Sequence, residues 1–244
     1  MMPLVRSLRR FAHALWCTAF LLVLCSLVPA QDSSPAPDTA PALPSVTFTQ
    51  SFPHSRPAYF SLRIDSAGHA SYESRREEGE PDQPVLGEPY HVEFVISEAT
   101  ARRIFSLAES LNYFQGDWDF KKHRIADTGS KTLLYADSTR NHQTTYNWSE
   151  NRAVQELTDI FQGISSTQEA ANELTRLRRY DRLGLNHQLE RMEDLAKNGW
   201  LRELQVIAPL LEKLANDREI MNIARQRAQH LLQLAASPAP VPPN

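Results

Sequence analysis

The spacing of apolar residues changes once along this chain, and the change divides it into two parts. Between residues 46 and 148 apolar side chains alternate with polar ones, as in 59–65 (YFSLRID), which is typical of strands with one buried face. Between residues 167 and 236 leucines recur every three or four positions, which is typical of amphipathic helices. The sequence therefore predicts a sheet followed by a group of packed helices.

The first part is expected to form an antiparallel sheet. Short turns such as Ser66-Ala67-Gly68 join neighbouring alternating segments, so these segments form hairpins. The stretch 75–88 is charged and contains two prolines and two glycines, so we expect a solvent loop there. The alternating segments are 59–65, 69–73, 90–96, 131–137 and 142–148.

Two helices interrupt these strands. Ser97 can cap the first helix, and Ser149 can cap the second, because a serine hydroxyl accepts a hydrogen bond from a free backbone N–H of the first turn. Gly163 is expected to end the second helix. The order of strands, helix, strands and helix predicts an α+β domain at 46–164, with an antiparallel sheet that carries two helices on one face.

The second part, 167–236, is expected to be an all-helical module. Its helices are separated at 183–186, at Asn198-Gly199 and at Asn216-Asp217, which predicts two helical hairpins. Leu174-x-x-Leu177 recurs as Leu211-x-x-Leu214, so a helical solenoid remains an alternative. We place the joint at 161–167, where Thr167 can cap a new helix, and we expect the two domains to fold separately.

Residues 1–30 resemble a secretory signal peptide. A basic start with Arg6, Arg9 and Arg10 precedes an apolar run at 11–28 and a small-residue site that ends at Ala30. Cleavage near Ala30 would remove Cys17 and Cys25, the two cysteines of the chain, and give a secreted or periplasmic protein without disulfides or thiols. An uncleaved segment that stays as a membrane anchor is the alternative, since about twenty apolar residues can span a bilayer.

Proline-rich segments flank the expected fold. Residues 31–45 (QDSSPAPDTAPALPS) are rich in proline, alanine and serine and predict an extended linker between the signal and the sheet. Residues 237–244 (SPAPVPPN) have the same composition and predict a disordered tail. Neither segment shows the apolar periodicity of a helix or a strand.

The charge of the chain argues against nucleic acid as a partner. The formal net charge is −3, and removal of residues 1–30 takes away three arginines and no acid, which leaves −6. Binding to phosphate backbones needs an excess of basic residues. After signal cleavage the sequence predicts no membrane span, and an unidentified envelope or extracellular protein is the expected partner.

Motifs for chemistry are absent from the sequence. It has no Gly-x-Ser-x-Gly elbow, no phosphate-binding glycine loop and no His-Glu-x-x-His, so we predict no cofactor and assign no catalytic residue. The polar run 117–127 places Asp117, Asp119, His123 and Asp127 close together. An EF-hand that starts at Asp117 would need glycine and an acid where Lys122 and Thr128 stand, so we predict no metal site.

Four arginines form the most basic exposed set of the helical part. Arg176, Arg178, Arg179 and Arg182 lie within seven residues. They can form a docking patch for an acidic partner, which includes the acidic sheet domain of the same chain. They can equally be a solvated helix face balanced by Glu173 and Asp181.

The segment 57–68 (PAYFSLRIDSAG) and the order of elements after it resemble a family of bacterial envelope proteins that is itself uncharacterised, a domain of unknown function. The resemblance covers residues 51–164. Members of that family often carry two cysteines before the Pro-x-Tyr, and Phe52 and Arg56 stand in those places here. The resemblance implies the fold and the envelope location and implies no activity.

These observations predict an exported binding or assembly component of the bacterial cell envelope. The alternative is a secreted or periplasmic hydrolase whose acids meet only in the folded protein, and the missing motifs favour binding over catalysis. A cleft with two or more acids of raised pKa would favour the hydrolase.

Overall fold

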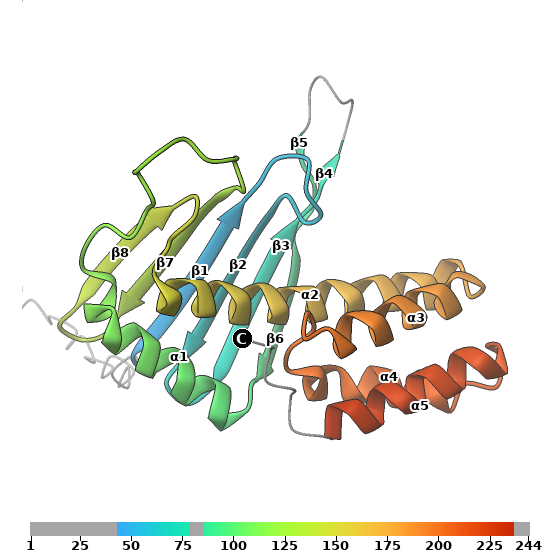
Figure 1. Cartoon of the computed structure of the whole chain (residues 1–244). Coiled ribbons are helices and arrows are strands. Elements are labelled where there is room, and N and C mark those ends of the chain that lie inside the picture. Colours follow the sequence, from blue (N-terminus) through green and yellow to red (C-terminus); the bar gives the residue numbers. More distant parts are fainter. Residues whose placement is uncertain (1–42, 79–84, 237–244) are drawn as a thin grey trace, which may run out of the picture. The chain divides into compact units, whose positions relative to one another are not determined.

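The five alternating segments and one strand that they do not include, β1, form a six-stranded antiparallel sheet with the order β6-β3-β2-β1-β7-β8 (Figure 1). The structure is a computed structural model that describes residues 43–78 and 85–236. The predicted signal peptide, most of the linker and the proline-rich tail lie outside the described residues. The strands are β1 (Ser45–Ser51), β2 (Tyr59–Asp65), β3 (His69–Arg75), β6 (Tyr90–Val95), β7 (Ser130–Ala136) and β8 (Asn141–Tyr146).

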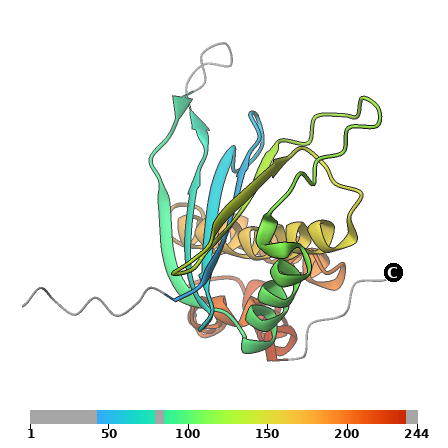
Figure 2. The same ribbon diagram turned by 90° about the vertical axis from the view of Figure 1, so that its left-hand side faces the viewer.

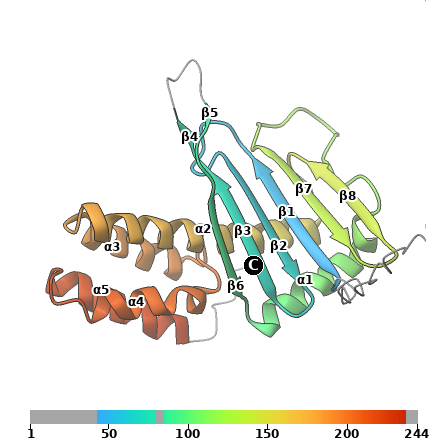
Figure 3. The ribbon, with the colours of Figure 1, turned by 180° about the vertical axis from the view of Figure 1, so that it is seen from behind.

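One face of the sheet carries two helices, as the sequence predicts. Helix α1 (Glu98–Ser110) and the first half of α2 (Arg152–Tyr180) lie on the same side of the strands (Figures 1 and 2). Viewed from behind, the other face is not covered by helices (Figure 3). Phe48 of β1 stacks on Phe161 of α2, with ring centroids 5.3 Å apart, at the centre of this first core.

Helix α1 begins where the sequence places it. The Ser97 hydroxyl accepts a hydrogen bond from the Thr100 N–H at 3.3 Å, and Glu98 lies in the first turn, where its charge favours the helix dipole. After α1 the residues Asn112–Phe114 all have positive φ. Left-handed backbone is costly for residues with a side chain, and here the burial of Phe114 helps to hold it in place.

The C-terminal region is helical and builds a second core. Its elements are a continuation of α2, then α3 (Gly184–Lys197), a short 3-10 helix (Leu204–Ile207), α4 (Ala208–Ala215) and α5 (Asn222–Ala236). Helices α2 and α3 form one antiparallel hairpin and α4 and α5 a second one (Figure 1). The α+β class, the antiparallel sheet and the helical hairpins are therefore confirmed.

Gly163 does not end a helix, and the prediction of a helix break at this glycine is wrong. Helix α2 runs through it for 29 residues, and Thr167, expected to cap a new helix, is buried inside α2. Gly163 is needed because the chain near Arg202 crosses α2 here. A Cβ on Gly163 would lie 2.6 Å from Cγ of Arg202, and the Arg202 N–H donates to the Gly163 carbonyl at 3.2 Å.

Three smaller expectations also need correction. Asn151, not Ser149, caps α2, because the Asn151 carboxamide oxygen accepts from the backbone N–H of Ala153 at 2.9 Å. Ser45 belongs to β1 and not to the linker. The stretch 75–88 contains a short hairpin of β4 (Glu77–Glu78) and β5 (Val85–Leu86) where a loop was expected.

A thin polar layer separates the two cores along α2. The first core ends at Ile164 and the second begins at Ala170. Between them the Ser165 hydroxyl shares a hydrogen bond of 2.8 Å with the Tyr72 hydroxyl, and the Thr167 hydroxyl donates to the Arg202 carbonyl at 2.7 Å. The division into domains at 46–164 and 167–236 stays a prediction, with its boundary now inside a continuous helix.

A second link joins the helical region to α1. The Glu203 carboxylate accepts hydrogen bonds from the Ser97 N–H at 2.6 Å, from the Ser97 hydroxyl at 2.9 Å and from the Thr100 hydroxyl at 2.5 Å. It therefore caps the N-terminus of a helix more than 100 positions earlier in the chain. Glu203 itself has φ of 58°, a strained value for a residue with a side chain.

We predict that Gly163→Ala lowers the stability of the protein. Glycine to alanine inside a helix normally gains about 1 kcal/mol. Here the new methyl group must push the Arg202 stem away, and such overpacking costs about 1–3 kcal/mol. Urea denaturation followed by circular dichroism measures the balance.

Ser166→Ala is the control, because Ser166 is exposed on the same helix three positions away. This variant should be as stable as the native chain or slightly more stable, since alanine is the better helix former. If Gly163→Ala also increased the stability, the Arg202 side chain could move aside at little cost, and its packing would not require glycine at position 163.

We also predict that a fragment of residues 45–164 unfolds cooperatively. All residues of the first core lie within it, so its apolar surface stays buried without the helical region. It should be less stable than the full chain, because it loses the Glu203 cap of α1. Differential scanning calorimetry tests this, and an unfolded or aggregated fragment would mean that the chain is one domain.

Candidate functional site

A polar strip runs along one flank of α2 and forms the floor of a groove. Its side chains recur at intervals of three or four residues, so they lie on one side of the helix. From Gln155 to Arg176 the strip extends for about 30 Å at 1.5 Å per residue. The strip consists of Gln155, Thr158, Asp159, Gln162, Ser165, Ser166, Glu169, Glu173 and Arg176.

Three adjoining hollows lie along this strip. The first, of about 340 Å³, shares Asp159 and Gln162 with the second, also of about 340 Å³. The second shares five lining residues with the third, of about 580 Å³. Because neighbouring hollows share lining residues, they form one groove. The residues shared by the second and third hollows are Arg56, Pro57, Ser165, Ser166 and Trp200.

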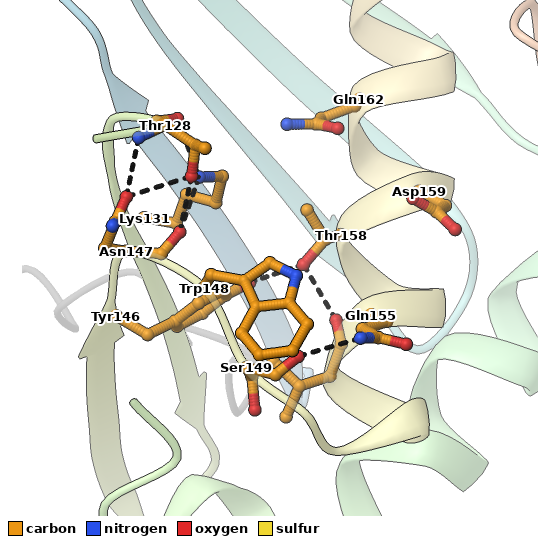
Figure 4. A pocket seen from close by; sticks show the side chains of 11 residues that line it. Thr128, Lys131, Tyr146, Asn147, Trp148, Ser149, Gln155, Thr158, Asp159 and Gln162 are labelled. Carbon is orange, nitrogen blue, oxygen red and sulfur yellow. Dashed lines mark hydrogen bonds between the residues drawn. The ribbon is translucent and has the colours of Figure 1, made fainter. Parts of the chain in front are cut away.

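The first hollow lies between α2 and the adjacent ends of β7 and β8. Figure 4 shows Lys131, Asn147 and Trp148 on one side of it, with Asp159 and Gln162 on the other. The Lys131 ammonium donates to the carbonyls of Thr128 and Asn147, both at 2.8 Å. Burial lowers the pKa of Lys131. Its donors are used by the backbone, so Lys131 holds the wall in place rather than facing a ligand.

Trp148 stands at the rim of this first hollow. Its side of the groove is fixed by Phe120, whose N–H donates to the Trp148 carbonyl at 2.9 Å. The two rings meet edge to face, with centroids 5.1 Å apart. Trp148 is 39% exposed, so one part of the indole is packed and another part is open to the groove.

The second hollow brings together residues that are distant in the sequence. The loop after β1 supplies Ser55, Arg56 and Pro57, and the segment after α3 supplies Trp200 and Arg202. Trp200 is 63% exposed. The Nε atom of Arg202 is buried and makes no hydrogen bond within the described residues.

Asp159 is the acid shared by the first and second hollows. Burial raises the pKa of Asp159 above its ordinary value of 3.8, against the opposing charge of Arg202. Glu156 adds to the increase through repulsion of like charges. Because the Asp159 side chain is exposed, solvent screens part of this effect.

The third hollow has a mixed charge pattern. Arg76 donates to Glu169 at 3.2 Å, and Arg176 donates to Glu173 at 2.6 Å. The hydrogen bond from Arg176 lowers the pKa of Glu173. Arg191 also lines this hollow, and it makes no hydrogen bond or ion pair in the part of the chain that the structure describes.

The four arginines singled out in the sequence lie on the helical region. Arg176 lies in the third hollow, while Arg178 pairs with Asp217 at 3.1 Å and Arg182 with Glu219 at 2.6 Å. Arg179 lies over the ring of Tyr180, 5.1 Å from its centroid. The structure thus divides these arginines between the groove and ion pairs within the helical region, and a docking role for them stays a prediction.

The acids of the run 117–127 take part in local hydrogen bonds. Asp117 pairs with Lys121, Asp119 accepts from the Asn147 N–H at 3.0 Å, and Asp127 accepts from the Gly129 N–H at 2.9 Å. Within residues 43–78 and 85–236, no three histidine, cysteine or acidic side chains are grouped as metal ligands.

No protein-family model matches the chain, and no curated protein matches it in sequence. The resemblance to the bacterial envelope family is therefore a hypothesis. Among the described helices, none is both long and apolar enough to cross a membrane.

Sequence reasoning did not find this groove. The floor leaves a signal in the sequence, because polar residues recur every three or four positions from Gln155 to Glu173. The walls leave none, because Arg56, Trp148 and Trp200 come from three connecting segments that only the fold brings together. The arrangement offers amide, hydroxyl and guanidinium groups with two exposed indole rings, which suits binding of a long polar ligand.

We predict that Asp159→Asn stabilises the protein at neutral pH and not in acid. A folded-state pKa above the unfolded value means that ionisation costs folding free energy. This cost is absent below about pH 3.8, where both states are protonated, and is complete above the folded-state pKa. Urea denaturation of both proteins at about pH 7 and about pH 3.5 measures it.

The test of this prediction is whether the effect of Asp159→Asn on the free energy of unfolding differs between the two pH values. Glu156→Gln is the comparison variant: it removes the smaller cause of the raised pKa of Asp159 and, with it, the ion pair of Glu156 with Arg103 at 2.5 Å. It should not stabilise the protein at neutral pH. If Asp159→Asn changed the free energy of unfolding equally at both pH values, its effect would come from contacts and not from ionisation.

Proposed function

We propose that this protein is an exported binding or assembly component of the bacterial cell envelope, and that its ligand lies in the groove along α2. One observation carries the proposal: a floor of polar side chains on one helix is flanked by exposed Trp148 and Trp200, which come from separate connecting segments. Exposed large aromatic rings beside a concave polar surface are characteristic of recognition sites.

The envelope location rests on the sequence. Residues 1–30 have the basic start, apolar run and small-residue end of an export signal. Removal of these residues leaves a chain without cysteine, whose described part has two apolar cores for its stability. The resemblance of residues 51–164 to an envelope family supports the same compartment.

The balance of acids in the groove supports binding more than hydrolysis. A hydrolase that works with two carboxyl groups needs one of them protonated at its working pH. Asp159 has a raised pKa and Glu173 a lowered one, but the two lie fourteen residues apart on one helix, about 21 Å at 1.5 Å per residue, which is too far for both to act on one bond. The hydrolase remains the second candidate because of Asp159 alone.

Co-sedimentation with the envelope fraction of the producing cells tests the proposal. We expect the native protein to sediment with this fraction and the double variant Arg56→Gln/Trp200→Ala to remain in the supernatant, since both residues line the second and third hollows. Both side chains are exposed, so the variant should keep the fold.

The matched control is Arg179→Gln/Tyr180→Ala, which removes an exposed arginine and an exposed aromatic residue at the end of α2. It should sediment like the native protein. Loss of binding in the control with retention in the groove variant would transfer the binding site to the arginine patch and overturn the assignment to the groove.

A further inference from the structure

We propose that the second and third hollows bind an anionic polysaccharide, through its acidic groups and its sugar rings. This inference rests on the proposed function, because it names the ligand of the same groove. It is carried by the charge of the hollows, by guanidinium groups with unused hydrogen-bond donors, and by the position of Trp200.

The two hollows are positively charged on a negatively charged protein. Five arginines and three acids line them, an excess of two positive charges, whereas the whole chain has a net charge of −3. A local charge opposite to that of the protein attracts ligands of the other sign. The charged residues are Arg56, Arg76, Arg176, Arg191 and Arg202, with Asp159, Glu169 and Glu173.

Three of these guanidinium groups have unused hydrogen-bond donors. Arg76 and Arg176 are paired with Glu169 and Glu173. Arg56 and Arg191 make no hydrogen bond or ion pair with the described residues, and Nε of Arg202 is buried without an acceptor. The exposed donors of Arg56 and Arg191 are open to a bound carboxylate or phosphate, whereas Nε of Arg202 is enclosed by the protein.

Trp200 and the neutral side chains of the hollows fit sugar rings. The indole is 63% exposed and lies in the wall shared by the two hollows, where its flat apolar face can cover the C–H groups of a pyranose ring. Amide and hydroxyl groups, which both donate and accept, line the same two hollows and suit sugar hydroxyls. They belong to Gln50, Ser166, Gln188 and Asn198.

The floor of the groove argues against an acidic peptide. Extended peptides are recognised through main-chain hydrogen bonds along a sheet edge or through apolar anchors in pockets. The floor here is α2, whose backbone groups bond within the helix, and the side chains that it presents are polar. A sugar polymer needs neither feature.

Isothermal titration calorimetry with the purified full chain tests the ligand class. We expect an oligosaccharide of galacturonic acid to bind and a neutral oligosaccharide of glucose of equal length to bind at least about tenfold more weakly. Added salt should weaken binding of the acidic oligosaccharide, because exposed charges are screened. An oligoglutamate peptide of equal length should also bind at least about tenfold more weakly.

Substitutions of Arg56 and Arg191 test whether the acidic oligosaccharide binds in these two hollows. Arg56→Gln and Arg191→Gln should each weaken binding of the acidic oligosaccharide about tenfold, the loss of one charge-assisted hydrogen bond, with unchanged thermal unfolding. Trp200→Ala should weaken binding to acidic and neutral oligosaccharides alike. The control Arg179→Gln, which removes an exposed arginine outside the groove, should bind like the native chain.

The outcomes distinguish this inference from the proposed function. Preference for the neutral oligosaccharide or for the peptide, with loss on Trp200→Ala, would overturn the anionic glycan and keep the groove as a binding site. Binding that depends on Arg179 and not on Arg56 would overturn both. Binding of inorganic phosphate as tight as that of the acidic oligosaccharide would show that the groove recognises charge alone, and would also overturn the glycan.

Discussion

The continuity of helix α2 is the feature on which the rest of this structure depends. Its first half packs on the sheet through Phe161 and Ile164, and its second half packs on the other helices through Leu174 and Leu177. Because one rigid helix belongs to both cores, its backbone connects the sheet directly to the helical region. The flank of α2 that faces neither core is then left between them, and this flank is the floor of the groove.

The junction of the two cores is polar, and this has structural consequences. Two carboxylates, one on α2 and one in the segment after α3, accept hydrogen bonds at this junction. Glu169 of α2 accepts from Ser74 at 2.5 Å, and Glu203 accepts from Ser97 at 2.6 Å. Hydrogen bonds to charged groups require correct geometry and lose much of their value when it is wrong, whereas apolar contacts tolerate sliding. A polar junction therefore fixes the relative position of the two cores more strictly than an apolar one. The strained backbone of Glu203 is a cost of this arrangement, because it accompanies the hydrogen bonds that Glu203 accepts from Ser97.

Local patterns in the sequence predicted most helices and strands, although they missed β1 and the continuity of α2, and they failed for the long-range relations between elements. The alternation in 59–65 and the cap at Ser97 predict β2 and α1 because neighbouring residues determine them. Gly163 was misread because a glycine in a helix has two explanations, a stop or a close approach, and only the position of Arg202 decides between them. The groove was missed for the same reason, since Arg56 and Trp200 meet only after the chain has folded. The polar strip on α2 was the one trace of it in the sequence.

The groove also explains why a protein would keep features that reduce its stability. A buried Nε of Arg202 without an acceptor and a carboxyl group of raised pKa at Asp159 both cost folding free energy. Selection for stability alone would pair or replace such groups, as it has paired Arg178 with Asp217 and Arg182 with Glu219 on the helical region. Arg202 and Asp159 both line the second hollow on the flank of α2, next to an indole that is open to solvent, whereas Trp118, His142 and Arg225 carry the other buried polar atoms without a partner among the described residues and lie outside the groove. A charged group whose pKa is perturbed, next to an exposed indole and unpaired guanidinium groups, is suited to contact a ligand, and this combination is the physical argument that the flank of α2 is used for binding.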